Sequence, residues 1–142
     1  MCKTCGSKSW GAFCLLVIMV IGCGRGGLER AVVTGRATYQ GEAIANGEIR
    51  FVPTKGTQGP ISGGSIIEGA YTADGLGGVP VGTYRVEIRA FRASKAAQLD
   101  PLGDAFVPPK QYLPEKYNTK TELEITIEPG SSKITKNFDL AD

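Results

Sequence analysis

Residues 83–92 read TYRVEIRAFR, and this stretch carries the clearest structural pattern in the chain. Every second residue is aromatic or apolar: Tyr84, Val86, Ile88 and Ala90. The residues between them are charged: Arg85, Glu87 and Arg89. An alternation with a period of two is typical of a β-strand that buries one face and exposes the other to water. We therefore predict a strand over residues 83–92, with the charged stripe in solvent.

Shorter stretches with the same alternation occur on both sides of this strand. We expect strands over residues 33–39, 47–53, 121–128 and 133–140, and a hairpin over residues 65–72 that turns at Glu68 and Gly69. Glycine and proline separate these stretches about every ten residues, and no stretch has a convincing helical period. The pattern predicts an all-β domain built as a seven-stranded antiparallel sandwich.

One position in the last predicted strand breaks the alternation. The apolar face of residues 133–140 contains Ile134, Phe138 and Leu140. A strict period of two places Lys136 on the same inner face. Two alternatives remain at this stage: either the aliphatic stem of the lysine lets its amine reach water, or the strand contains a bulge.

The first residues of the chain have the three-part layout of a secretory signal peptide. Lys3 and Lys8 supply positive charge, residues 12–21 are apolar, and Gly22 ends the apolar run. A membrane-spanning helix needs about 20 apolar residues, and this run has half that length. Two alternatives to a lipoprotein signal peptide remain. The apolar run is either a short membrane-spanning segment or the signal peptide of an ordinary secreted protein, in which Cys23 occurs by chance.

Residues 20–23, VIGC, resemble the bacterial lipobox, in which apolar and small residues precede the cysteine that receives the lipid. The resemblance implies that Cys23 is acylated, and two lipid chains suffice for stable membrane attachment. We divide the chain into a signal peptide (1–22), a lipidated cysteine with its tether (23–30) and one β-domain (31–142). Gly24 stands where an aspartate would favour the inner membrane, so we expect a lipid-anchored protein of the bacterial cell envelope, in the outer membrane.

Composition excludes several classes of chemistry. The chain has no histidine, so Ser-His-Asp or Cys-His catalysis cannot occur and the commonest metal ligand is missing. Cys2 and Cys5 have the spacing of half a zinc or redox site, but Cys14 and Cys23 do not complete it.

Removal of residues 1–22 takes away two of 16 basic residues and none of 14 acidic ones, so the excess of positive charge that nucleic-acid binding needs is absent. We expect no metal, no cofactor, no nucleic-acid partner and no enzymatic activity.

Acidic and glycine-rich stretches offer weaker hypotheses. Glu122 and Glu124 lie two apart on one predicted strand face, as a carboxylate pair for glycoside hydrolysis could, but such neighbours are more typical of a solvated stripe. If their strand lies beside the strongest predicted strand, the two charged stripes would form cross-strand pairs. Asp100 and Asp104 lack the spacing of a calcium-binding loop. Residues 75–82 contain four glycines without the Lys-Ser/Thr of a phosphate loop, and turn geometry explains them better.

Tyr112 and Tyr117 are the candidate binding residues. They lie within residues 93–118, a stretch with four prolines and no sustained period. Long irregular segments in compact domains are often functional. The two tyrosines form either an exposed aromatic platform for a sugar or peptide, or a lid that packs over the open end of the sandwich.

Two stretches carry a resemblance to a known family. Residues 33–51 read VTGRATYQGEAIANGEIRF, and residues 79–86 read VPVGTYRV. Their strand, glycine turn, Asn-Gly corner and Pro-x-Gly-Thr-Tyr corner resemble the carboxypeptidase regulatory-like (transthyretin-like) domains. With the lipobox and residues 112–119, YLPEKYNT, they are also similar to small predicted lipoproteins of planctomycete bacteria.

The family resemblance bears on fold far more than on function. It implies a prealbumin-like, seven-stranded sandwich and no established ligand. The hydrolase branch of the transthyretin relatives depends on histidines and on a C-terminal Tyr-Arg-Gly-Ser. This chain has no histidine and ends in FDLAD, so we do not expect that activity.

Two classes of function therefore remain. The first is a non-catalytic envelope module that binds or spaces proteins or glycans, through residues 93–118 or an exposed strand edge. The second is a transthyretin-like carrier that holds a small molecule or an ion between subunits. A monomer in solution favours the module, and a stable tetramer with a central channel favours the carrier.

Overall fold

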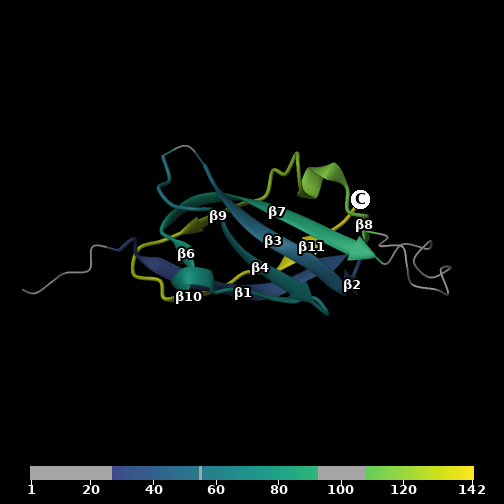
Figure 1. Cartoon of the computed structure of the whole chain (residues 1–142), viewed down its shortest axis with the longest axis horizontal. Helices are drawn as coiled ribbons and strands as arrows, with labels where there is room; N and C mark the ends of the chain where they lie inside the picture. The colour runs from purple at the N-terminus through teal and green to yellow at the C-terminus, as the bar shows by residue number, and fades with distance from the viewer. Residues whose placement is uncertain (1–26, 55, 93–107) are drawn as a thin grey trace, which may run out of the picture.

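The computed structural model describes residues 27–54, 56–92 and 108–142. The expected signal peptide and Cys23 lie outside the described residues, as do Asp100 and Asp104. The described chain is mostly antiparallel β-structure with two short 3-10 helices (Figure 1). Its elements, in chain order, are β1 (Arg30–Tyr39), β2 (Glu42–Ala43), β3 (Asn46–Pro53), β4 (Ser62–Ile67), β5 (Ala70–Ala73), η1 (Gly75–Gly77), β6 (Val79–Pro80), β7 (Gly82–Arg92), β8 (Lys110–Gln111), η2 (Glu115–Tyr117), β9 (Glu124–Ile127), β10 (Lys133–Thr135) and β11 (Phe138–Leu140).

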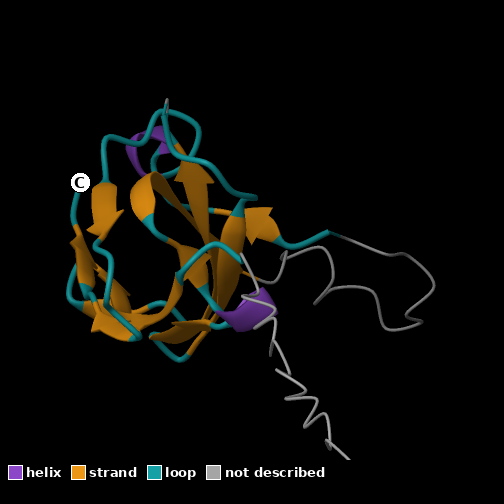
Figure 2. Ribbon diagram, turned by 90° about the vertical axis from the view of Figure 1, so that its left-hand side faces the viewer, coloured by secondary structure: helices purple, strands orange, loops and turns teal. Residues whose placement is uncertain are grey.

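The strands form one curled sheet with two halves. In the first half, β1 pairs with β5 on one side and with β10 and β11 on the other. In the second half, β4, β3, β7 and β9 follow one another in this order. β4 joins the halves because it pairs with β3 over its whole length and with β5 at Ile66 and Ile67. Figure 2 shows the sheet curving around a single interior.

Most of the strands predicted from the sequence are confirmed. The predicted strands over residues 33–39, 47–53 and 83–92 correspond to β1, β3 and β7. The predicted hairpin is formed by β4 and β5, and its turn residues Glu68 and Gly69 have φ angles of 49° and 79°. Positive φ at two successive residues is typical of a tight hairpin turn. The strand expected over residues 121–128 is shorter in the structure, where it is β9.

The described residues contain eleven strands, where we expected seven. Three of the additional strands, β2, β6 and β8, have two residues each and pair with the ends of β1 or β7. The fourth results from the division of residues 133–140 into β10 and β11. The division favours the bulge alternative for Lys136, whose side chain is exposed.

The expectation of a wholly antiparallel sheet is wrong for β10 and β11, which run parallel to β1. After β9 the chain turns through residues 128–132 and crosses to the other half of the sheet, so it enters beside β1 in the same direction. At the break, the Asn137 side-chain oxygen accepts a hydrogen bond from the Arg36 backbone N–H at 3.0 Å. This amide takes the place of a backbone acceptor where the ladder is interrupted.

The core is built from the inward residues of both halves. The inner face of β7 is fully buried at all four predicted positions: Tyr84, Val86, Ile88 and Ala90. It packs with apolar residues of the other strands: Ala31, Val33, Ala37, Ile49, Phe51, Ile66, Tyr71, Ile125, Ile127, Phe138 and Leu140. Burial of these alternating residues supplies the main driving force for folding.

Gly35 of β1 lies at the closest approach between β1 and the break in the last strand. A Cβ atom at position 35 would lie 1.7 Å from the carbonyl oxygen of Lys136. The buried Tyr71 hydroxyl donates a hydrogen bond of 2.6 Å to the same carbonyl. The Lys136 N–H donates to the Thr34 carbonyl at 2.8 Å. This contact therefore requires a residue without a side chain at position 35.

Replacement of Gly35 by alanine tests this contact. Because the methyl group would overlap a hydrogen-bonded backbone carbonyl, we expect Gly35→Ala to lower the free energy of unfolding by about 3 kcal/mol. Gly27→Ala is the control, since a methyl group added at that position would have no atom within 4 Å. Chemical denaturation of both variants measures the difference, and equal stabilities would contradict the assignment.

Tyr71 gives the fold a predictable response to alkaline pH. Burial raises the pKa of its hydroxyl far above the ordinary value of 10.0, so folding favours the neutral form. The associated stability is fully present below pH 10 and decreases above it, by about 1.4 kcal/mol per pH unit. Tyr71→Phe removes both the hydrogen bond and this titration.

We expect Tyr71→Phe to be less stable than the wild type at pH 8, by about 1 kcal/mol for the lost hydrogen bond. The difference should shrink and then reverse above pH 10, because residue 71 of the wild type then ionises in the unfolded chain but not in the fold, which stabilises the unfolded state. Denaturant titrations at several pH values measure both stabilities. A constant difference from pH 8 to pH 12 would show that Tyr71 does not titrate as described.

Candidate functional site

β1 extends along the length of the domain, and its two ends mark the two ends of the domain. β1 has ten residues, which correspond to about 30 Å of extended chain. Its first residue, Arg30, pairs with Pro80 of β6, and its last residue, Tyr39, pairs with Glu42 of β2 and Leu140 of β11. We call these the proximal and the distal end. In Figure 1 the described chain begins at the left, proximal end, and the C-terminus lies at the right, distal end.

Tyr112, the first predicted binding residue, lies at the distal end and is half-buried. Its backbone N–H donates to the Ala90 carbonyl at 3.1 Å, which ties it to the end of β7. The ring centroids of Tyr112 and Tyr39 lie 6.1 Å apart. The guanidinium carbon of Arg92 lies 4.0 Å from the Tyr112 ring centroid, a distance typical of a cation–π contact.

Tyr117, the second predicted binding residue, lies in η2 at the same end and is also half-buried. Its hydroxyl donates to the Ala141 carbonyl and accepts from the Ala141 N–H at 2.9 Å. The neighbouring Tyr39 hydroxyl donates to the Asp142 carboxylate, and this hydrogen bond raises the pKa of Tyr39. The structure thus gathers three tyrosines and the last described residues at the distal end.

Residues 112–121, which we call the lid segment, are held by buried groups. Leu113 is 5% exposed and packs into the core. The buried Asn118 donates to the Pro114 carbonyl at 3.0 Å and accepts from the Thr119 N–H at 2.7 Å. The buried Thr121 hydroxyl donates to the Val86 carbonyl at 2.7 Å. This packing corresponds to the lid alternative, with both predicted tyrosines retaining partial exposure.

A hollow with a volume of 360 Å³ lies between the lid segment and the outer face of β7. It is lined by Arg89, Phe91, Gln111, Leu113, Glu115, Asn118 and Thr119. Phe91 is a half-buried aromatic side chain on the outer face of β7, where the preceding outward residues are charged. Sequence reasoning did not single out Phe91 or Gln111. The break in the charged stripe at Phe91 was the available signal.

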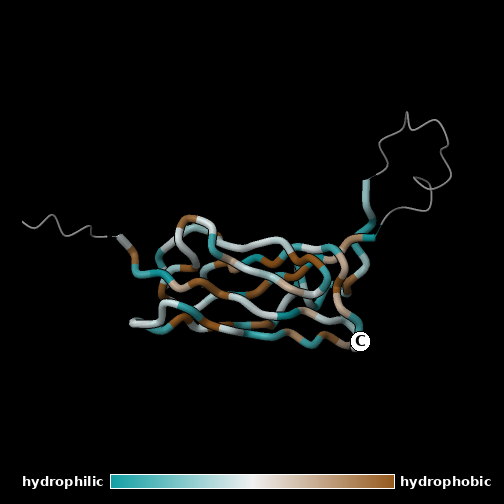
Figure 3. The backbone as a smooth tube through the Cα atoms, turned by 90° about the horizontal axis from the view of Figure 1, so that it is seen from below, coloured by the Kyte–Doolittle hydropathy of each residue, from teal (hydrophilic) through white to brown (hydrophobic). Residues whose placement is uncertain are grey.

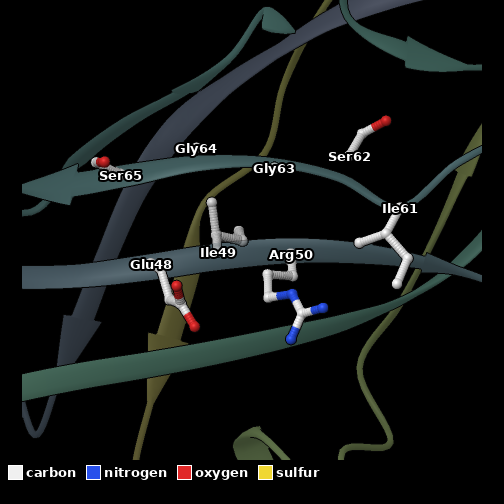
Figure 4. A pocket seen from close by; sticks show the side chains of 8 residues that line it. All are labelled: Glu48, Ile49, Arg50, Ile61, Ser62, Gly63, Gly64 and Ser65. Carbon is white, nitrogen blue, oxygen red and sulfur yellow. The ribbon is translucent and has the colours of Figure 1, made fainter.

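A second hollow, of 340 Å³, lies over β3 and β4. Figure 4 shows Glu48 and Arg50 projecting to the same side of β3, beside the stretch of β4 where Gly63 and Gly64 carry no side chains. Arg50 lies 3.7 Å from Glu87 across the sheet. This hollow is formed by missing side chains on an ion-paired sheet face, and it contains no aromatic residue.

The predicted charged stripes lie side by side, because β9 pairs with β7 and places Glu124 opposite Arg85. The ion pairs that form on β7 nevertheless include β3. Their nitrogen–oxygen distances are 3.7 Å for Arg50–Glu87, 3.6 Å for Arg85–Glu87 and 3.5 Å for Arg89–Glu48. Glu122 and Glu124 are both exposed, and Glu122 precedes β9. This arrangement is that of a solvated stripe.

The glycine-rich stretch after β5 forms the short helix η1 and no phosphate-binding loop of the strand–loop–helix type. Leu76 within it has a φ of 55° and Gly78 a φ of 109°, which are turn conformations. In the described residues no group of three or more His, Cys, Asp or Glu side chains is placed to hold a metal ion. Likewise, no helix in the described part of the chain has the length and apolarity needed to cross a membrane.

The fold and the distal surface can be compared with known proteins. No family model, no curated protein and no solved structure matches this chain. The distal end is the candidate site, since it combines the two predicted tyrosines with a neighbouring hollow that contains an aromatic side chain.

Replacement of Asn118 by alanine tests how the lid segment is held. The change leaves the Leu113 and Pro114 carbonyls without this donor, so we expect a loss of about 2 kcal/mol in the free energy of unfolding. Amide exchange should increase in residues 112–121 and remain slow in β1. Glu122→Ala, at an exposed position directly after the lid segment, is the control. Unchanged exchange in the lid segment of Asn118→Ala would contradict the description.

Proposed function

We propose that this protein is a lipid-anchored, non-catalytic module of the bacterial cell envelope, a tethered domain that binds or spaces proteins or glycans through its distal end. The observation that carries the proposal is the position of the chain's entry. The Glu29 carbonyl accepts from the Val81 N–H at 2.8 Å, so the chain is fixed at the proximal end with only five residues between this point and Cys23. A lipid on Cys23 then directs the distal end away from the membrane.

The tether is too short to let the domain turn over freely. From Cys23 to Glu29 the chain reaches about 20 Å when fully extended, which is less than the length of β1. The distal surface with Tyr112 and Tyr117 therefore faces away from the membrane. A binding surface at this end suits a module that contacts or spaces other envelope components.

We also propose that the fold is a prealbumin-like sandwich, as in the carboxypeptidase regulatory-like domains that the sequence resembles. The strand order β5-β1-β10/β11 in one half and β4-β3-β7-β9 in the other supports this proposal. Seven strands remain when β10 and β11 count as one interrupted strand and the two-residue strands are set aside. Such folds serve many functions, so the fold alone names no ligand.

The charged groups at the candidate site support binding rather than catalysis. Glu115 forms an ion pair of 2.6 Å with Lys120, and this contact lowers the pKa of Glu115. A general acid needs a raised pKa instead. Aromatic rings, amides and an arginine are well suited to hold a sugar or a peptide by stacking and hydrogen bonds.

Acylation of Cys23 is the first expectation to test. Intact mass spectrometry of the protein from a bacterial host should give a chain that begins at Cys23 and carries the mass of attached acyl chains. Cys23→Ser should retain residues 1–22 and carry no lipid. A wild-type chain that still contains Met1, or that has an unmodified Cys23, would contradict the anchor and the envelope location.

Site-specific photocrosslinking tests the distal binding surface. A photoreactive residue at Lys116 or Thr119, both exposed in the lid segment, should capture a discrete partner in native envelopes. The same residue at Thr126, which is exposed on β9, is the control. Equal capture from both places would contradict a distal site. A stable tetramer in size-exclusion chromatography with light scattering would favour the carrier function.

A further inference from the structure

Large apolar side chains are exposed at four positions in the described part of the chain. Their exposed fractions are 47% for Leu28, 50% for Ile61, 66% for Ile67 and 84% for Leu76. Ile67 ends β4 at the hairpin near the distal end, whereas the other three lie in the proximal half. Single exposed apolar residues are normal, but three near one end of a small domain indicate a surface that contacts something.

The three residues lie in segments that meet around β6. Leu28 immediately precedes Glu29, which pairs with Val81 directly after β6. Ile61 ends the loop that folds over Pro80: a Cβ atom on Gly59 of this loop would lie 3.0 Å from the Pro80 Cγ atom. Ile61 itself lies at the end of the hollow over β3 and β4, beside Arg50, where the loop enters β4 (Figure 4).

Leu76 reaches the same region through η1, which joins β5 to β6. The Arg30 guanidinium donates to the Gly78 carbonyl at 3.0 Å and fixes η1 against the start of β1. η1 also contacts β4, the strand that follows Ile61. In Figure 1, η1 is the short coil beside β6 and β10, and Figure 3 shows hydrophobic segments of the chain at this end.

Leu76 combines an exposed apolar side chain with an uncommon backbone conformation. Its φ and ψ angles are 55° and 25°, in the left-handed region that glycine or asparagine adopts more easily. The side chain is the most exposed of the large apolar residues in the described chain, so it stabilises little within the domain. A strained, outward leucine is therefore expected where the side chain has an external contact.

We propose that Leu28, Ile61 and Leu76 form a lipid-contact surface. Through this surface the proximal end contacts the headgroup region of the bilayer. The inference rests on the proposed lipid anchor, because the occupant follows from the length of chain between Cys23 and the domain. Only five residues separate Cys23 from Glu29, so this end stays within about 20 Å of the bilayer surface. Interfacial apolar side chains then insert beside the lipid headgroups.

The charged residues near this surface predict that its contact with lipid is apolar and not electrostatic. The Glu29 carboxylate accepts from the Gly130 N–H, and Arg30 is engaged with Gly78, so one acid and one base are both used within the domain. Asp74 and Glu128 are exposed close to the same end. Arg50 beside Ile61 is paired with Glu87, and Lys133 on β10 is exposed, so the bases described at this end are accompanied by acids and form no cluster that would require anionic lipids. We therefore expect contact with zwitterionic phosphatidylcholine vesicles, independent of salt concentration.

Lipid-borne quenchers give a direct test. The lipidated chain would contain no free thiol, since its other cysteines precede Cys23, so Leu76→Cys introduces a single labelling site. A fluorophore at this site, with the protein anchored in phosphatidylcholine vesicles, should lose most of its emission when the vesicles contain spin-labelled lipids. Ile67→Cys is the matched control, because it is an exposed apolar position near the other end of the domain, and its label should be little affected. Equal quenching at the two sites would overturn the inference.

A double variant separates lipid contact from a structural role. The double variant Ile61→Ser and Leu76→Ser should fold as the wild type does, because both side chains are exposed. In vesicles its residues 74–78 should exchange amide hydrogens faster than those of the wild type, whereas in solution without vesicles the two proteins should exchange equally. No difference in vesicles would count against the surface.

The outcomes also separate this inference from the proposed function. Mass spectrometry of the same samples reports whether Cys23 is acylated. An unmodified Cys23 refutes the anchor, whereas an acylated Cys23 with equal quenching at Leu76 and Ile67 refutes only the lipid-contact surface. A photoreactive label at Leu76→Cys that captures a protein in native envelopes, together with no lipid quenching in vesicles, would assign the surface to a protein partner and overturn the proposal.

Discussion

At Gly35 the backbone of β1 meets the carbonyl group of Lys136, and the Tyr71 hydroxyl donates to that same oxygen. This contact joins the last part of the domain to the first. It occurs where the last strand changes from β10 to β11, so both pieces depend on it for their position beside β1. Without this close approach, β10 and β11 would not be held beside β1 in the first half of the sheet.

The two ends of the domain follow from this arrangement. Because β11 lies parallel to β1, the C-terminal residues reach the same end as Tyr39, where Ala141 binds the Tyr117 hydroxyl. β6 and the entry of the chain lie at the opposite end. The lid segment and the hollow beside Phe91 thus lie far from Glu29, so the tether that we propose would place the membrane at one end of the domain and the proposed binding surface at the other.

Local alternation was sufficient to predict β1, β3, β7 and the β4–β5 hairpin, because each strand has one buried and one solvated face. The turn at Glu68 and Gly69 could be placed from its glycine, which tolerates positive φ. The direction of β10 and β11 could not be predicted in this way. Parallel pairing with β1 depends on how the chain crosses between the halves, and no periodicity encodes that.

The candidate site was predictable only in part. Tyr112 and Tyr117 could be found as aromatic residues in an irregular segment, but their approach to Tyr39 and Ala141 depends on tertiary packing. The hollow beside Phe91 arises where β7 and the lid segment diverge. The lipobox of residues 20–23 is a linear motif, so its recognition needs no structure, and its modification stays a prediction.

Amide exchange at Lys136 tests the closure of the sheet most directly. The Lys136 amide would exchange rapidly if residues 133–140 were only loosely attached to β1. The hydrogen bond to the Thr34 carbonyl predicts the opposite. We expect the Lys136 amide to exchange as slowly as those of β7, through global unfolding alone. Exchange as fast as that of the exposed Gly75 amide would contradict the proposed architecture at its central contact.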